Sequence, residues 1–189
     1  MKPVLASAIP ALWTAWIVIW LVTARSVKRE RWREPLRLRL LHTVPFLLCA
    51  LLLAGPGACF GPLSLRFAPV GATLPEIGTA MVAAGLAFAC WARFHLGRNW
   101  SGIVVVKEGH TLVRSGPYRC VRHPIYSGML LAIAGTALAV GEWRGLLAFA
   151  FALVAVLIRV NAEEALMRRE FPEYEAYRRG TAALVPLLF

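Results

Sequence analysis

Long apolar runs alternate with short basic segments along this chain, and the runs have the length of membrane-spanning helices. A transmembrane helix needs about 17–25 mostly apolar residues, and somewhat shorter runs suffice where two helices pair as a hairpin. The pattern predicts five helices, near residues 8–24, 41–65, 74–93, 126–140 and 145–160. The second reaches residue 65 only if the bend at Gly55-Pro56-Gly57 is tolerated. We therefore predict an all-α, polytopic integral membrane protein.

The linker between the last two predicted helices is very short. Residues 141–144 alone separate the two runs, which forces the fourth and fifth helices into an antiparallel hairpin. The end of the fifth helix should then lie beside the start of the fourth. A loop over 94–125 and a tail over 161–189 would join them at that end, within a single domain spanning residues 1–189.

Composition supports the membrane assignment, because 59% of the residues are hydrophobic and ordinary soluble domains reach roughly 45–50%. The mean hydropathy is +0.62. A net charge of +11 would suit nucleic acid, but the basic residues flank the predicted spans. Topology and anionic lipid headgroups explain them more simply, so we expect membrane lipids and no nucleic acid as partners. The four cysteines lack the spacing of metal ligands, and we expect no metal site.

Three basic segments indicate the orientation. They lie between the first and second helices, between the third and fourth, and after the fifth, so five spans place all of them on one side. Cytoplasmic segments are enriched in Lys and Arg. We therefore expect the N-terminus outside and the C-terminus in the cytoplasm.

The polar, turn-rich segment 115–128 contains most of the candidate chemistry. Pro124 suits the first turn of the fourth helix, with His123 extended before it, so Arg122 and His123 gather at a helix N-terminus that favours anions. The hairpin should bring Glu163 and Glu164 close to them. The alternative is that Arg122 only contributes to the orientation in the membrane and that His123 only donates a hydrogen bond to a loop carbonyl. Upstream, the valine run 104–106 predicts a short extended piece.

An ordered set of motifs in the C-terminal half resembles the isoprenylcysteine carboxyl methyltransferase family. The motifs are Leu-Gly-Arg-Asn-Trp-Ser at 96–101, His-Thr-Leu-Val at 110–113, Gly-Pro-Tyr at 116–118, Arg-His-Pro-Ile-Tyr-Ser-Gly at 122–128 and Glu-Glu at 163–164. The resemblance implies S-adenosyl-L-methionine as methyl donor, held in a cytosolic pocket between the loop, the fourth helix and the end of the fifth. The implied donor-binding residues are His110, Leu112, Val113, Gly116, Pro117, Tyr118, His123, Tyr126, Glu163 and Glu164.

The implied catalytic residues are Arg122, Glu163 and Glu164. Tyr118 and Tyr126 would contact the donor, one glutamate would take its ribose hydroxyls or its amino group, and Arg122 would orient the carboxylate of either donor or acceptor. The sequence does not decide between these options. A carboxylate acceptor is already ionised at neutral pH, so the protein need only align it and exclude water.

The family resemblance therefore predicts methyl transfer to the carboxylate of a lipophilic, isoprenylcysteine-like acceptor. Three alternatives stay open: a phospholipid amine N-methyltransferase, which needs a base such as His123; an NADPH-dependent membrane reductase; and a non-enzymatic membrane scaffold. The composition, rich in Ala, Leu and Arg, favours a bacterial inner membrane. The acceptor and the oligomeric state are not predicted.

Overall fold

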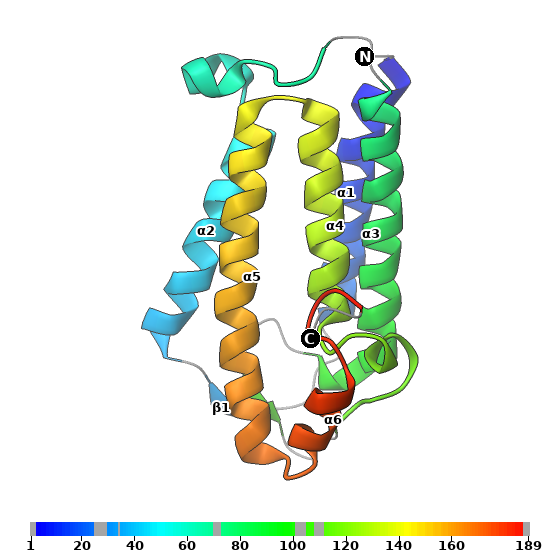
Figure 1. Ribbon diagram of the computed structural model, residues 1–189, viewed down its shortest axis with the longest axis vertical. Helices are drawn as coiled ribbons and strands as arrows, with labels where there is room; N and C mark the ends of the chain where they lie inside the picture. The colour runs from blue at the N-terminus through cyan, green and yellow to red at the C-terminus, as the bar shows by residue number, and fades with distance from the viewer. Residues whose placement is uncertain are drawn as a thin grey trace.

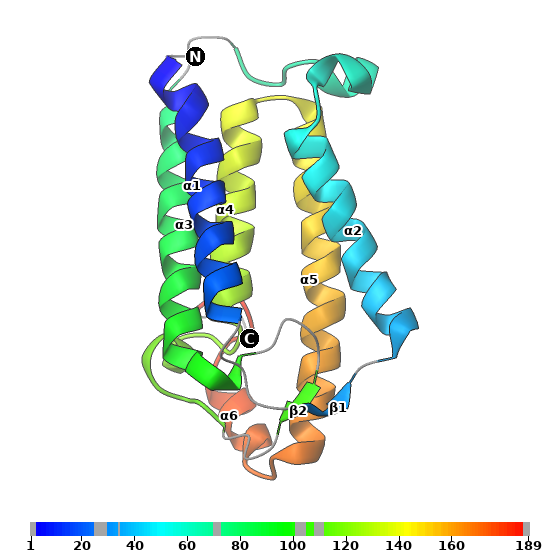
Figure 2. The same cartoon turned by 180° about the vertical axis from the view of Figure 1, so that it is seen from behind.

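A computed structural model describes residues 3–24, 30–33, 35–69, 73–100, 105–107 and 112–186. Its main elements are five long helices that run along one common direction (Figures 1 and 2). They are α1 (Pro3–Thr23), α2 (Leu36–Ala54), α3 (Leu74–Leu96), α4 (Pro124–Val140) and α5 (Trp143–Glu170). The predicted α-helical bundle is confirmed.

The helices form a row in which each packs mainly on its neighbour. The order across the row is α1, α3, α4, α5 and α2, and the tightest pairing joins α3 to α4. Helices α4 and α5 form the predicted antiparallel hairpin, and only Gly141 and Glu142 link them. We call the end of the bundle that holds Thr23, Leu96 and Pro124 the site end, and the other the hairpin end (Figure 1).

Short elements close both ends. At the site end, strand β1 (Glu30–Arg33) pairs antiparallel with β2 (Val105–Lys107), which confirms the extended valine run. Three further elements are the 3-10 turns η3 (Gly97–Asn99) and η4 (Gly116–Arg119) and the short helix α6 (Tyr174–Gly180). At the hairpin end lies the 3-10 segment η2 (Gly57–Ser64).

The predicted second helix over 41–65 is corrected at both ends. Helix α2 begins at Leu36, directly after Pro35, because the turns that contain Arg37 and Arg39 are helical although they are charged. It ends at Ala54, because Gly55 precedes Pro56 and takes the extended conformation that this position favours. The guanidinium of Arg144 donates to the carbonyls of Leu52 and Gly55 at 2.6 and 2.9 Å and so caps this end.

The fifth helix also differs from the prediction of 145–160, and so does the tail predicted over 161–189. Helix α5 continues to Glu170, because residues 161–170 are mostly strong helix formers. It stops at Phe171, which is extended before Pro172. Smaller shifts affect the first, third and fourth helices, so His95 and Leu96 belong to α3 and not to the loop predicted over 94–125.

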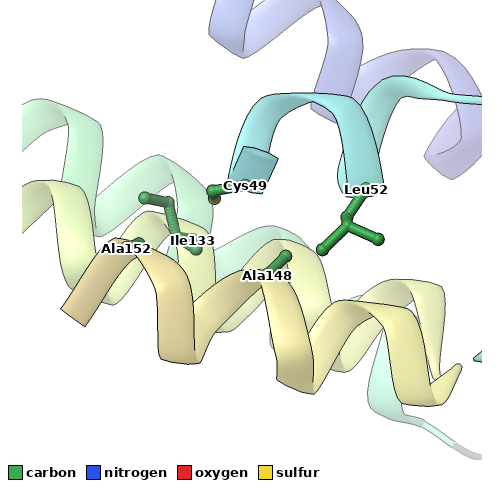
Figure 3. Packing of buried hydrophobic residues seen from close by; sticks show 5 residues of the cluster. All are labelled: Cys49, Leu52, Ile133, Ala148 and Ala152. Carbon is green, nitrogen blue, oxygen red and sulfur yellow. The ribbon is translucent and has the colours of Figure 1, made fainter. Parts of the chain in front are cut away.

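Apolar packing joins the two halves of the row. Cys49 and Leu52 of α2 meet Ala148 and Ala152 of α5 and Ile133 of α4 in one buried cluster (Figure 3). Small residues on α5 let α2 approach closely, as in membrane helix pairs. Within the described residues, α2, α3 and α5 are long and apolar enough to cross a membrane, while the described parts of α1 and α4 are apolar but shorter.

Candidate functional site

The hairpin brings the end of α5 back to the first turn of α4, where a compact charged cluster forms. Glu164 accepts from Arg122 Nε at 2.7 Å and lies 3.2 Å from His123 Nε2. Glu163 accepts from the Tyr126 hydroxyl at 2.5 Å, and its other oxygen lies 3.5 Å from His123 Nδ1. His123 thus stands between the two carboxylates. We call these five residues the charged cluster.

Two further basic side chains contact the charged cluster. Arg159 Nε donates to the Tyr126 hydroxyl at 2.5 Å and to Glu163 at 3.1 Å, four residues on in the same helix. These two side chains are only 12% and 24% exposed, so the pair lies largely out of solvent. Arg178 of α6 lies 3.4 Å from the second oxygen of Glu164. Glu164 therefore meets three basic groups.

A segment that follows α6 binds the start of α4 through its main chain. The backbone N–H groups of Arg122 and His123 donate to the carbonyls of Ala182 and Ala183 at 2.9 and 3.0 Å. The Arg122 guanidinium also donates to the Thr181 carbonyl, and the Ser127 hydroxyl to the Leu184 carbonyl. We call residues 181–184 the tail strap. It covers the charged cluster with backbone oxygens.

Tyr118 connects this cluster with the end of α3. Its side chain is buried, and its hydroxyl donates to the Ala92 carbonyl at 3.5 Å, while its own carbonyl accepts from the Tyr177 hydroxyl at 2.5 Å. Burial is the main cause that raises the pKa of Tyr177 to about 12. Both phenols therefore stay protonated at neutral pH and act as hydrogen-bond donors.

The remaining predicted donor-binding residues lie on η4 or just before it. Leu112 and Val113 are half-buried, and Pro117 is buried in η4. Gly116 has a φ of +59°, and a Cβ there would come within 2.6 Å of the His95 ring, so only glycine fits this turn. His110 lies outside the described residues.

Residues 78–169 match the Isoprenylcysteine carboxyl methyltransferase (ICMT) family. Over this region the chain is similar to that family. The matched region holds all five residues of the charged cluster and leaves out the tail strap. The resemblance read from the ordered motifs is thereby confirmed.

Individual relatives of the chain carry two kinds of name. The cobalt-zinc-cadmium resistance protein CzcN of Cupriavidus metallidurans is 37% identical over 99 residues, which cover 49% of the chain and 44% of that protein. The protein-S-isoprenylcysteine O-methyltransferase of Schizosaccharomyces pombe is 34% identical over 101 residues, which cover 51% of the chain and 43% of that protein. The chain thus spans less than half of the length of either relative.

Sequence reasoning missed the tail strap and the role of Tyr177. The strap contributes carbonyl oxygens, which every residue type carries, so the side chains at 181–184 give no signal. Arg159 and Arg178 are visible in the sequence as basic residues near a helix end, but only the fold shows that they turn toward Glu163 and Glu164.

The stability of this fold should depend on the protonation of His123. Burial alone would lower the pKa of this imidazole, but hydrogen bonds and charges from Glu163 and Glu164 raise it above its ordinary value of 6.5. The groups that face it are these two carboxylates and the Tyr126 ring stacked at 5.8 Å. The imidazolium therefore stabilises the fold fully below pH 6.5, and this stabilisation is lost as the pH rises through the folded pKa.

Thermal unfolding in detergent between pH 5.5 and 9 measures this linkage. We expect the Tm of the wild type to fall above pH 6.5 relative to a His123→Gln variant, which has no imidazole to titrate. A wild-type Tm that rises relative to the variant over the same range would contradict the assignment.

Proposed function

We propose that the chain is a membrane methyltransferase that uses S-adenosyl-L-methionine and transfers its methyl group to the carboxylate of a lipophilic acceptor. The observation that carries the proposal is the convergence of Glu163, His123 and Tyr126 at the site end, inside the region that matches the family. The family match supports the reaction class, and the geometry supports the place where the donor would bind.

The two glutamates differ in a way that separates their proposed roles. Each glutamate meets three polar side chains, but Glu164 is only 8% exposed, so it serves to hold the charged cluster together. Glu163 is 24% exposed. We therefore assign to Glu163 the amino group or the ribose hydroxyls of the donor.

The chemistry of the site fits the donor. A sulfonium and an ammonium group call for a carboxylate and aromatic faces, which Glu163, Tyr126 and Tyr118 supply. The Arg122 guanidinium is committed to Glu164 and to the carbonyls of Arg178 and Thr181. Its proposed role is accordingly to position Glu164 and the tail strap.

The hydrogen bonds also favour a carboxylate acceptor over an amine. The donor supplies a methyl group bound to a positive sulfur; as the O–CH3 bond forms and the S–CH3 bond breaks, no proton is transferred. An amine acceptor would need a base. His123 faces both glutamates, and Tyr126 donates to Glu163, so both groups are already engaged. The residues of the site therefore serve to orient the donor and the acceptor and to exclude water.

We propose that all five long helices cross the membrane and that the site end is cytoplasmic. Helix α5 has 28 residues and at about 1.5 Å per residue exceeds a hydrocarbon core of about 30 Å, so its last turns reach beyond the core. Basic residues cluster at this end, as in cytoplasmic segments. They include Arg37, Arg39, Arg114, Arg119, Arg122, Arg168, Arg169, Arg178 and Arg179.

Calorimetric titration of the detergent-purified protein tests the proposal. We expect saturable binding of S-adenosyl-L-methionine and of its demethylated product, and none of NADPH. Transfer of a labelled methyl group to an alkylthioacetic acid in bilayers then tests the acceptor class. Binding of NADPH alone would favour a reductase, transfer to a phospholipid amine would favour N-methylation, and binding of neither nucleotide would favour a scaffold.

A further inference from the structure

Among the side chains that the structure describes, Arg93, Arg122, Arg144 and Arg159 are largely removed from solvent, and the last three meet a carboxylate. Arg122 lies 2.7 Å from Glu164, Arg144 lies 2.5 Å from Glu142, and Arg159 lies 3.1 Å from Glu163. Arg93 is a residue of the last turn of α3 and is only 3% exposed. Among the described residues, no carboxylate forms an ion pair with it.

The contacts of Arg93 are carbonyl oxygens and one aromatic face. Its Nη1 donates to the Gly97 carbonyl at 2.9 Å, and its Nη2 donates to the Thr23 carbonyl at 2.7 Å. Its guanidinium carbon stands 4.3 Å from the centre of the Trp100 ring. Its Nε is buried and has no hydrogen-bond partner within the described part of the chain.

These contacts fix the guanidinium without neutralising it. Carbonyl oxygens and an aromatic face orient a cation, but a buried charge is stabilised best by a counter-ion. A buried N–H without a partner is rare in folded proteins and calls for an explanation. Both observations point to an anion that is supplied from outside the described residues.

The surroundings of Arg93 connect it with the charged cluster. Its neighbour Ala92 accepts the hydroxyl of Tyr118, which interacts electrostatically with both Arg93 and Glu163. Trp20, Trp100, Tyr118 and Tyr126 all belong to one apolar cluster at the site end. Helices α1 and α3 therefore contribute aromatic side chains and the Arg93 cation to the same cluster that contains Tyr118 and Tyr126.

We propose that Arg93 binds the carboxylate of the acceptor and thereby selects acidic over neutral or amine acceptors. The inference rests on the proposed function and deepens it, because it names the group that holds the acceptor. The aliphatic part of the acceptor would lie along Trp20, which stacks on Trp16 at 4.4 Å. Arg93 would act as a binding residue and take no part in proton transfer.

Binding of dodecanoate to the full chain in lipid nanodiscs tests the inference, with the demethylated donor product present. We expect Arg93→Met, which preserves apolar contact with Trp100, to weaken dodecanoate binding at least tenfold. Arg93→Lys, which keeps the charge, should lose less affinity. Binding of the neutral dodecanamide and of the donor product should not change in either variant.

A matched control is Arg66→Met. Arg66 also donates to backbone carbonyls, those of Ala68 and Val140, but it lies at the hairpin end. We expect this variant to bind dodecanoate as the wild type does. Because Arg93 also ties Thr23 to α3, the Tm of each variant is measured first, and Arg93→Lys provides the comparison if Arg93→Met does not fold.

Three results would overturn the inference. The first is no dodecanoate binding by the wild type, and the second is equal affinity of the wild type and the folded Arg93 variants. The third is strong coupling of Arg93→Met with Glu108→Gln in Tm, which would make a residue of the chain itself the counter-ion. Donor binding that persists in these cases would leave the proposed function intact. If the protein does not bind the donor but its binding of dodecanoate depends on Arg93, only the proposed methyl transfer is overturned.

Discussion

Replacing Glu163 with glutamine is expected to weaken the binding of S-adenosyl-L-methionine by roughly 10- to 100-fold. Hydrogen bonds to a charged group contribute about 1.5–3 kcal/mol, and glutamine keeps the shape of the side chain while it removes the charge. The Tyr126 hydroxyl can still donate to the amide oxygen, so the nearby geometry is largely preserved. Calorimetric titration of the purified variant gives the affinity directly.

The matched control for this substitution is Glu142→Gln. Glu142 is 19% exposed and pairs with Arg144 at 2.5 Å, so its loss also removes a carboxylate from a buried arginine, but at the hairpin end. We expect Glu142→Gln to lower the Tm without changing donor affinity. Equal donor affinities in wild type and Glu163→Gln, with both proteins folded, would exclude Glu163 from the donor site.

Replacing Gly85 with alanine is expected to destabilise the bundle by about 1–3 kcal/mol, the range for overpacking a tight interface. For a chain of this size such a loss lowers the Tm by roughly 2–12 °C. Helices α3 and α4 approach so closely here that a Cβ on Gly85 would lie 2.5 Å from the Gly128 carbonyl oxygen. The contact is reciprocal, because a Cβ on Gly128 would lie 2.5 Å from the Gly85 carbonyl oxygen.

Gly78 and Gly135 repeat the same close contact two turns away, so α3 and α4 meet along a seam of glycines and alanines. A Gly85→Leu variant should give no folded protein. The control is Gly180→Ala, where a Cβ would meet no atom within 4 Å and the stability should change by less than about 0.5 kcal/mol. Similar melting temperatures for Gly85→Ala and Gly180→Ala would contradict the close packing.

The helices could be predicted from the sequence because each carries an apolar run that water would disfavour. The ends of the helices were harder to predict. Helix α2 begins in a charged turn, and α5 continues for ten residues, most of them helix formers, beyond the apolar run. Strand β1 was missed, because its four residues, Glu-Arg-Trp-Arg, show no strand periodicity and pair with residues far along the chain.

The side chains of the charged cluster could be foreseen because a short hairpin leaves the ends of its helices side by side. Glu163 and Glu164 therefore had to lie near His123 once the fourth and fifth helices were joined by a short turn. Two features were beyond reach. The tail strap acts through main-chain atoms, and the contacts of Arg93 with carbonyl oxygens depend on how α1 docks on α3.

The tail strap makes the order of synthesis matter for the site. Arg122 binds the carbonyl of Thr181, a residue made 59 positions later, after both helices of the hairpin. During translation, the start of α4 is therefore made before the strap carbonyls that accept hydrogen bonds from Arg122 and His123. The membrane can accept the hairpin before the site exists, and the site is completed only when the strap docks.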